Sequence, residues 1–161
     1  MRKILAAISI ISTIAIADMS TSYSCGECYY DCTTSYIGPA GDLDRIGVKH
    51  YKVGKYPEAI MYHYRACIYG SASGCNHAGY MYDQGKGVLR DYRIARKYFT
   101  LSCNYGDGVG CSNLGVLYEE GQGVEQSDTK AKYYYQKSCD LGMSVGCRNL
   151  DLLNRYLLLT K

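Results

Sequence analysis

Net charge is the first quantity that this sequence has little of. Its 161 residues include 18 Lys and Arg and 15 Asp and Glu, which give a formal net charge of +3. So small an excess provides no basic field that would attract nucleic acid or anionic lipid. Tryptophan is absent and phenylalanine occurs once, whereas tyrosine occurs 19 times. Because tyrosine combines apolar area with a polar tip, it can line both a core and a wet groove.

The first 17 residues have the pattern of a secretory signal peptide. Residues 1–3 are basic or neutral, residues 4–16 are apolar and uncharged, and residues 15–17 (Ala-Ile-Ala) form a small-x-small cleavage site. The apolar run is too short for a spanning helix. We therefore expect export with no membrane span after cleavage, and a retained membrane anchor is the alternative. Cleavage after Ala17 removes two basic residues and lowers the net charge from +3 to +1.

A repeat of 36 residues organises most of the remaining chain. Five positions recur at this spacing in three copies. They are Ala59, Tyr62, Cys67, Gly70 and Cys75; Ala95, Tyr98, Cys103, Gly106 and Cys111; and Ala131, Tyr134, Cys139, Gly142 and Cys147. Matches at one constant spacing indicate a tandem repeat. The function must therefore be argued as that of a repeat array.

Each repeat predicts two helices, because the matched columns follow helical and not strand periodicity. The expected helices cover residues 42–53, 57–69, 75–84, 91–104, 111–120, 127–140 and about 144–159. Asp91 and Ser127 are the expected N-caps of two of them. Gly70, Gly106 and Gly142 stand where a helix ends in a left-handed cap. A helix pair of this size cannot bury its own apolar stripe, so neighbouring pairs must stack.

The predicted fold is an all-α solenoid of αα-hairpin repeats. Its expected units are 42–70, 71–106, 107–142 and a closing helix over 143–161, preceded by an irregular cysteine-containing segment over 18–41. The first unit has a shorter connection between its helices, because 12 residues separate Gly47 from Ala59 while 16 separate Gly79 from Ala95. The run of leucines at 157–159 is either the last packing surface or a dimer contact. We favour packing, because terminal repeats are usually atypical.

Six of the nine cysteines form pairs whose members are eight residues apart. The pairs are Cys67 with Cys75, Cys103 with Cys111, and Cys139 with Cys147. The first cysteine of each pair closes one helix and the second opens the next. A helix-turn-helix connection can bring the two Cα atoms within the 4.4–6.8 Å that a disulfide needs. We expect three disulfides that each fasten one repeat to the next, since export favours disulfides over redox sensing or metal binding.

The other three cysteines are Cys25, Cys28 and Cys32. The Cys-x-x-Cys spacing of the first two resembles a redox pair, but no thioredoxin-like strand pattern surrounds it. A tetrahedral zinc site needs four ligands, and no histidine is adjacent. We expect one local disulfide and one odd thiol, with thiol-disulfide exchange as the alternative.

Two motifs of the repeat resemble the Sel-1-like repeat: Leu114-Gly115-x-x-Tyr118-x-x-Gly121-x-Gly123-Val124 and Lys130-Ala131-x-x-Tyr134-Tyr135-x-Lys137-x-Cys139. Residues 54–59 (Gly-Lys-Tyr-Pro-Glu-Ala) resemble its relative, the tetratricopeptide repeat. Cysteines eight apart in every unit resemble the exported cysteine-rich Hcp β-lactamase family. The resemblance covers about residues 42–155. It implies a superhelix with disulfides between repeats, a periplasmic or secreted bacterial protein, and binding or slow hydrolysis of β-lactams.

No catalytic constellation is evident from the residues. Ser127-Asp-Thr-Lys130 matches the Ser-x-x-Lys string of serine β-lactamases, but Ser127 shares its column with Asp91 and is explained as a helix cap. The three histidines are not expected to cluster: His63 falls in a packing column, His77 aligns with two asparagines, and His50 has no obvious partner. We therefore expect no metal and no cofactor.

The remaining candidate is a binding surface on the first helix of each pair, which lines the concave side in this class of repeat. The candidate groove residues are His77, Tyr80, Asn113, Val116, Asn149 and Leu152. Asparagine offers a donor and an acceptor to a peptide backbone or a peptidoglycan fragment, although its side chains could equally satisfy neighbouring helices. We expect an exported scaffold that binds a protein, a peptide or a cell-wall fragment. A weak β-lactamase or penicillin-binding protein is the alternative.

Overall fold

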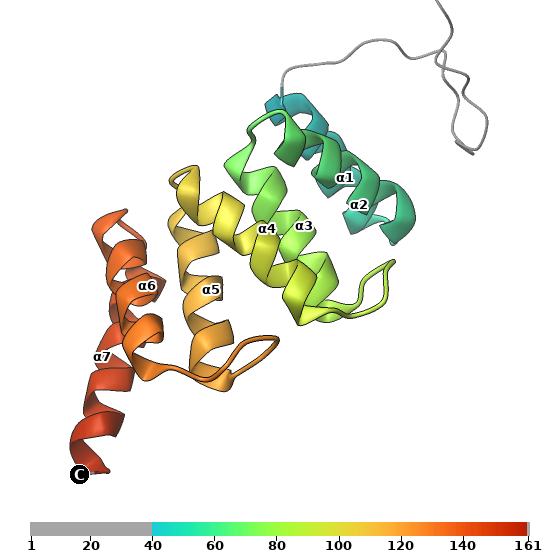
Figure 1. Cartoon of the computed structure of the whole chain (residues 1–161). Coiled ribbons are helices and arrows are strands. Elements are labelled where there is room, and N and C mark those ends of the chain that lie inside the picture. Colours follow the sequence, from blue (N-terminus) through green and yellow to red (C-terminus); the bar gives the residue numbers. More distant parts are fainter. Residues whose placement is uncertain (1–39, 161) are drawn as a thin grey trace, which may run out of the picture. The chain divides into compact units, whose positions relative to one another are not determined.

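The computed structural model describes residues 40–160, which form seven helices and contain no strands (Figure 1). The helices are α1 (Ala40–Lys52), α2 (Tyr56–Ile68), α3 (Ala72–Gln84), α4 (Tyr92–Asn104), α5 (Gly108–Glu120), α6 (Asp128–Asp140) and α7 (Ser144–Leu159). The all-α prediction is confirmed, and every helix end lies within three residues of its expected position. The predicted signal peptide, most of the irregular segment 18–41, and Cys25, Cys28 and Cys32 lie outside the described residues.

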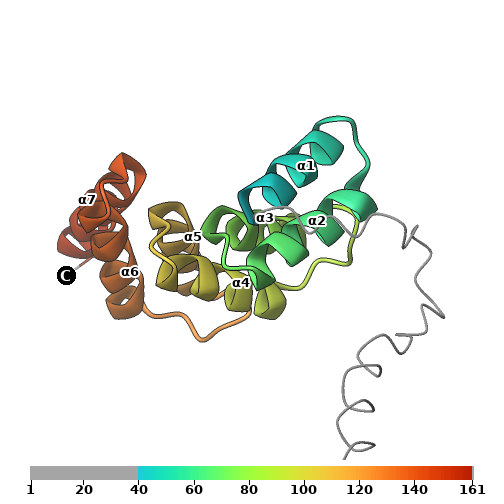
Figure 2. The ribbon, with the colours of Figure 1, turned by 90° about the horizontal axis from the view of Figure 1, so that it is seen from above.

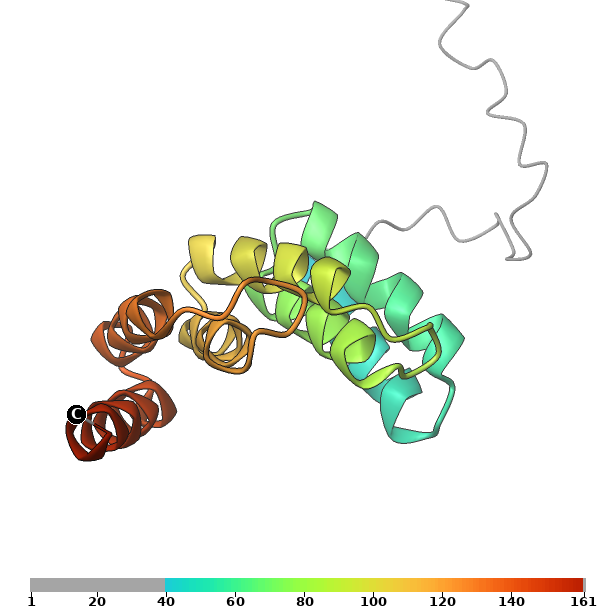
Figure 3. The same ribbon diagram turned by 60° about the horizontal axis from the view of Figure 1, so that its bottom comes forward.

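The helices form three antiparallel pairs, α1–α2, α3–α4 and α5–α6, and α7 packs on the last pair. Figures 2 and 3 show the odd-numbered helices in one row and the even-numbered helices in a second row. The rows curve, and the odd-numbered helices lie on the concave side (Figure 2). Contacts between successive odd-numbered helices, α1 with α3, α3 with α5 and α5 with α7, fit this inner position.

Capping residues fix where the helices begin and end. The Asp91 side chain accepts hydrogen bonds from the backbone N–H groups of Arg93 and Ile94, and the Ser127 hydroxyl accepts one from the N–H of Lys130. Both predicted N-caps are therefore confirmed. Gly70, Gly106 and Gly142 have φ of 87°, 87° and 83° and follow the C-cap residues of α2, α4 and α6. Only glycine adopts such angles without strain, so these residues end their helices.

Each helix pair is closed by a buried ring that packs on a glycine of the facing helix. The rings are His63, Phe99 and Tyr135, and the glycines are Gly47, Gly79 and Gly115. A Cβ atom built on Gly79 would lie 2.7 Å from the Phe99 ring. The glycine column is therefore required by close helix approach, because nothing larger than hydrogen fits beneath the ring.

The long loops between paired helices reach back to the preceding pair. A Cβ on Gly87 would lie 2.6 Å from the Cβ of Tyr56, and a Cβ on Gly123 would lie 2.7 Å from the backbone of Tyr92. Each loop thus covers the start of the previous even-numbered helix. The α1–α2 connection has no earlier helix pair to cover among the described residues, which fits its shorter length.

Disulfides join each even-numbered helix to the odd-numbered helix that follows. The bonded pairs are Cys67–Cys75, Cys103–Cys111 and Cys139–Cys147, with Cα–Cα distances of 4.5, 4.6 and 4.6 Å. The expected disulfides between repeats are therefore present in all three copies. In α1, Leu43 occupies the position of the second cysteine and is 5% exposed, so a packed leucine replaces the bond there.

The closing helix packs through one side only. Leu153 is 2% exposed and Leu157 contacts the same cluster, whereas Leu158 and Leu159 are 75% and 86% exposed. Packing of the terminal leucine run is thus limited to Leu157. No helix between residues 40 and 160 combines the length and the hydropathy of a membrane span.

The disulfides predict a defined loss of stability on removal. The Cys103→Ser/Cys111→Ser variant opens a closed loop of about nine residues and should lose about 2–3 kcal/mol of unfolding free energy. Urea unfolding followed by circular dichroism measures this difference, with the reduced parent protein as the control. Equal urea midpoints for the oxidised parent and the variant would contradict the stabilising role, as would peptide maps that join Cys103 to any other cysteine.

Candidate functional site

Polar side chains on the odd-numbered helices make one hydrogen bond between each pair of successive repeats. We call these bonds the polar ladder. Its rungs are His77 Nδ1 to Asp44 Oδ1 at 2.9 Å, Asn113 Nδ2 to Asn76 Oδ1 at 2.9 Å, and Asn149 Nδ2 to Ser112 Oγ at 3.4 Å. The predicted groove residues His77, Asn113 and Asn149 are therefore bonded to the neighbouring helix. This is the alternative that the sequence left open, and these side chains are less available to a ligand than expected.

The first rung differs from the others because it is charged and gains a third member. His63 Nδ1 donates to the same Asp44 Oδ1 at 2.7 Å, and the His63 and His77 ring centroids are 4.7 Å apart. Ser73 Oγ donates to Asp44 Oδ2 at 2.7 Å. Asp44, His63 and His77 come from α1, α2 and α3 and form a compact cluster, which we call the Asp–His–His cluster.

The expectation that the three histidines do not cluster is wrong for His63 and His77. They lie on α2 and α3, which the Cys67–Cys75 disulfide holds side by side. Asp44 was missed because it lies on α1, ahead of the shorter connection. His50 does lie apart from the cluster and stacks on Tyr62 with ring centroids 5.2 Å apart.

Burial and hydrogen bonding have opposite effects on the acid of this cluster. The side chains of His63 and Asp44 are 2% and 10% exposed, and that of His77 is 39% exposed. Burial by itself raises the pKa of the Asp44 carboxyl. Hydrogen bonds from His63, His77 and Ser73 outweigh this effect and hold its pKa far below the usual range. Asp44 is therefore a carboxylate at any physiological pH.

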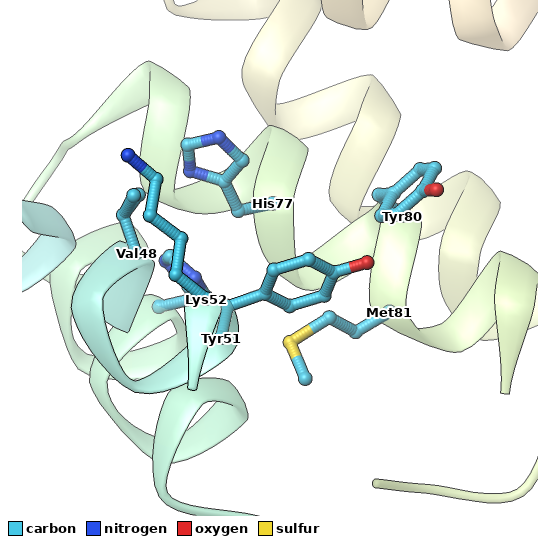
Figure 4. A pocket seen from close by; sticks show the side chains of 7 residues that line it. Val48, Tyr51, Lys52, His77, Tyr80 and Met81 are labelled. Atoms are coloured by element: carbon cyan, nitrogen blue, oxygen red, sulfur yellow. The ribbon is translucent and has the colours of Figure 1, made fainter. Parts of the chain in front are cut away.

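A pocket of about 250 Å³ lies beside the cluster, between α1 and α3. Its lining residues are Val48, Tyr51, Lys52, His63, His77, Tyr80 and Met81. In Figure 4, Tyr51 extends from α1 towards Tyr80 and Met81 of α3, and Lys52 and His77 lie on the other side of its ring. Partial burial and then the neighbouring Tyr80 raise the pKa of Tyr51. Its hydroxyl is therefore a neutral hydrogen-bond group.

The remaining predicted groove residues lie in one column of the odd-numbered helices. Tyr80 on α3 is 42% exposed and lines the pocket, and Leu152 on α7 is 56% exposed. Val116 on α5 is half-buried against the core cluster of Ala131 and Tyr135. Val48 occupies the same column on α1. Sequence reasoning missed it and the other pocket residues of α1 because no groove position was assigned to the first helix.

The Ser-x-x-Lys string does not form a catalytic pair. The Ser127 hydroxyl accepts the N–H of Lys130 as the cap of α6, and Lys130 Nζ lies 5.1 Å from the centroid of the Tyr118 ring. A capping bond and a cation–π contact account for both residues.

The structure thus defines a class of protein, a curved stack of disulfide-linked helical hairpins. The Sel1 repeat family matches residues 72–107 and 108–143, which correspond to two successive hairpins. The chain accordingly contains two Sel1 repeats.

Solved structures of similar proteins agree with this assignment. A Sel1 repeat protein from Oxalobacter formigenes is 25% identical, with a TM-score of 0.65 over 68% of this chain and 45% of that chain. Cysteine-rich protein B of Helicobacter pylori is 27% identical, with a TM-score of 0.54 over 68% of this chain and 96% of that chain.

A third similar structure is c5321, a protective antigen of uropathogenic Escherichia coli with the same repeat fold. It is 21% identical, with a TM-score of 0.70 over 74% of this chain and 26% of that chain, so the likeness concerns the fold alone. The chain matches less than half the length of the Oxalobacter and Escherichia proteins. No curated protein sequence matches the chain.

The capping role of Ser127 is testable. Ser127→Ala should lower the unfolding free energy by about 1 kcal/mol, because α6 loses the acceptor for a free backbone N–H group. Ser127→Asp should retain stability, since aspartate caps α4 at the equivalent position. Nitrocefin turnover by both variants should equal that of the parent, and loss of turnover in Ser127→Ala alone would restore a catalytic role.

The carboxylate of Asp44 predicts a specific acid response. Its pKa is lower in the folded than in the unfolded state, so the unfolded chain binds more protons as the pH falls below about 4. Its contribution is present above that pH and decreases by up to about 1.4 kcal/mol per pH unit below it. Urea unfolding between pH 3 and 7 should show this slope in the parent and a smaller slope in Asp44→Asn. Identical slopes would show that the carboxylate is not stabilised in the folded state.

Proposed function

We propose that this protein is an exported scaffold whose concave face binds a protein, a peptide or a peptidoglycan fragment. Sel1 repeats generally mediate protein interactions, which supports binding as the activity. The concave face is chosen because Tyr80 and Leu152 occupy equivalent positions on two of its helices. These side chains are exposed on the inner helices, whereas the polar side chains beside them are used in the ladder.

The pocket between α1 and α3 is the proposed anchor point on this face. Its volume of about 250 Å³ lies below the roughly 300–1,000 Å³ typical of small-molecule sites, and so suits a single large side chain or sugar substituent. Tyr51, Tyr80 and Met81 supply apolar surface, and Lys52 supplies a cation beside it. An apolar group that carries or adjoins a carboxylate fits this lining.

Three disulfides among the described residues support an oxidising compartment. The basic start, the apolar run and the Ala-Ile-Ala site at residues 15–17 add a route of export. We propose on these grounds that the mature protein is periplasmic or secreted. Its proposed units remain the three repeats and closing helix expected from the sequence.

The β-lactamase alternative gains no support from the described residues. Ser127 caps α6, and Lys130 contacts the ring of Tyr118. Within residues 40–160, no serine side chain is hydrogen-bonded to a lysine side chain. The likeness to Helicobacter pylori cysteine-rich protein B supports the disulfide-linked fold.

Substitutions on the two faces test the proposed function. The mature, oxidised parent is immobilised and exposed to periplasmic extract and to purified muropeptides. Tyr80→Arg/Leu152→Arg should weaken binding of a captured ligand at least tenfold, because it places charge on the proposed apolar contact surface. The matched control is Tyr64→Arg/Tyr133→Arg on the even-numbered helices, where the parent side chains are 47% and 62% exposed. Equal loss in both variants, or loss only in the control, would assign binding elsewhere.

A further inference from the structure

The Asp–His–His cluster contains the donor atoms of a metal site. Its two imidazole nitrogens and one carboxylate oxygen all lie within 4.8 Å of one another. Nitrogen and oxygen donors of these kinds are common ligands of zinc at about 2.0–2.2 Å. We propose that Asp44, His63 and His77 bind a divalent transition-metal ion, with zinc as the best fit.

The repeats provide an internal comparison that supports this assignment. The shorter first connection means that residues of α1 correspond to residues of α3 at a spacing of 32. Asp44 therefore corresponds to Asn76. At the regular spacing of 36, His63 corresponds to Phe99 and His77 to Asn113. The second repeat therefore builds the same buried ring and the same rung from neutral side chains. The fold therefore does not require a charged cluster. The presence of Asp44, His63 and His77 together, where the next repeat has neutral side chains, favours a ligand-binding role.

The geometry requires a small adjustment to accept an ion. The Asp44 Oδ1 atom lies 2.7 and 2.9 Å from the two Nδ1 atoms, whereas tetrahedral zinc ligands stand roughly 3.3 Å apart. His77 is 39% exposed and is the member that can move. Ser73 holds the second oxygen of Asp44, which is the type of outer contact that orients a ligating carboxylate.

Ion binding also changes where the imidazole hydrogens reside. Each Nδ1 now donates to Asp44 and must give up its hydrogen to present a lone pair to the metal. A neutral imidazole then carries that hydrogen on Nε2, without net proton release, while an imidazolium releases one proton. The pocket borders both histidines, so a water molecule in it would be the fourth ligand of a tetrahedral ion.

The test uses the mature, oxidised protein after removal of metal with a chelator. Cobalt(II) titration followed by absorption spectroscopy, and zinc titration followed by calorimetry, should each give one ion per chain. The cobalt spectrum should show the visible bands of nitrogen and oxygen ligation without sulfur-to-cobalt charge transfer. Zinc should also raise the unfolding temperature of the parent.

Variants that copy the second repeat remove the donors while keeping its packing chemistry. Asp44→Asn/His63→Phe/His77→Asn should weaken zinc binding at least 100-fold, and His77→Asn alone at least tenfold. The matched control is His50→Tyr, which copies Tyr82 and should bind zinc as the parent does. If the triple variant fails to fold, His77→Asn alone decides, because its side chain is partly exposed.

Three results would overturn the proposal. They are no zinc bound by the parent, zinc bound equally by His77→Asn, and a cobalt spectrum dominated by sulfur ligation, which would assign the ion to cysteines. The concave-face binding experiment can be told apart from this one, because Tyr80→Arg/Leu152→Arg leaves all three donor residues in place and the zinc titration uses neither extract nor muropeptides.

Discussion

Contact between a buried ring and a helical glycine sets the geometry on which the rest of this structure depends. His63, Phe99 and Tyr135 each lie so close to a glycine that a methyl group would collide with the ring. The two helices of a pair consequently approach closely, and alanine at 0% exposure fills the adjoining column. With helices this close, the core needs few large apolar side chains. The chain can therefore fold with one phenylalanine and no tryptophan, and its tyrosines can stack between the two helices of a pair, as Tyr82 and Tyr98 do.

Disulfides and the polar ladder extend this geometry from one pair to the next. Each disulfide links the outer row of helices to the inner row near a turn, and each rung links two inner helices. The two links act at different places, one between the rows and one within the inner row, so together they limit both the separation and the rotation of successive pairs. The inner helices are thereby held in contact, which fits their position on the concave side (Figure 2). A surface held in this way needs little reordering on binding, which lowers the entropic cost of association.

Local and periodic features were predictable from the sequence, and features that depend on helix register were not. Asp91 and Ser127 could be assigned as caps because a cap needs only its own backbone neighbours. The cysteine pairs could be assigned because the seven residues between their members include at least two glycines and leave little choice of path. The Asp44 contact joins α1 to residues 19 and 33 positions later, and depends on a connection four residues shorter than its counterparts. An alignment of α1 with α3 at a spacing of 32 places Asp44 at the position of Asn76. Since Asn76 bonds to Asn113, this alignment would have predicted the contact between Asp44 and His77.

The first repeat is where the regular pattern is broken, and its departures belong together. It lacks the long loop, it has leucine in place of a cysteine, and its Asp44 and His63 form a buried cluster with His77 of the second repeat. A neutral ring and an amide rung would fill the same space, as the next repeat demonstrates. Replacing them with a charged cluster incurs a desolvation cost that hydrogen bonds must offset, and the pocket opens at the same place. Stability therefore accounts for the neutral ring and amide rung of the second repeat, whereas the charged cluster is better explained by the ion binding that we propose.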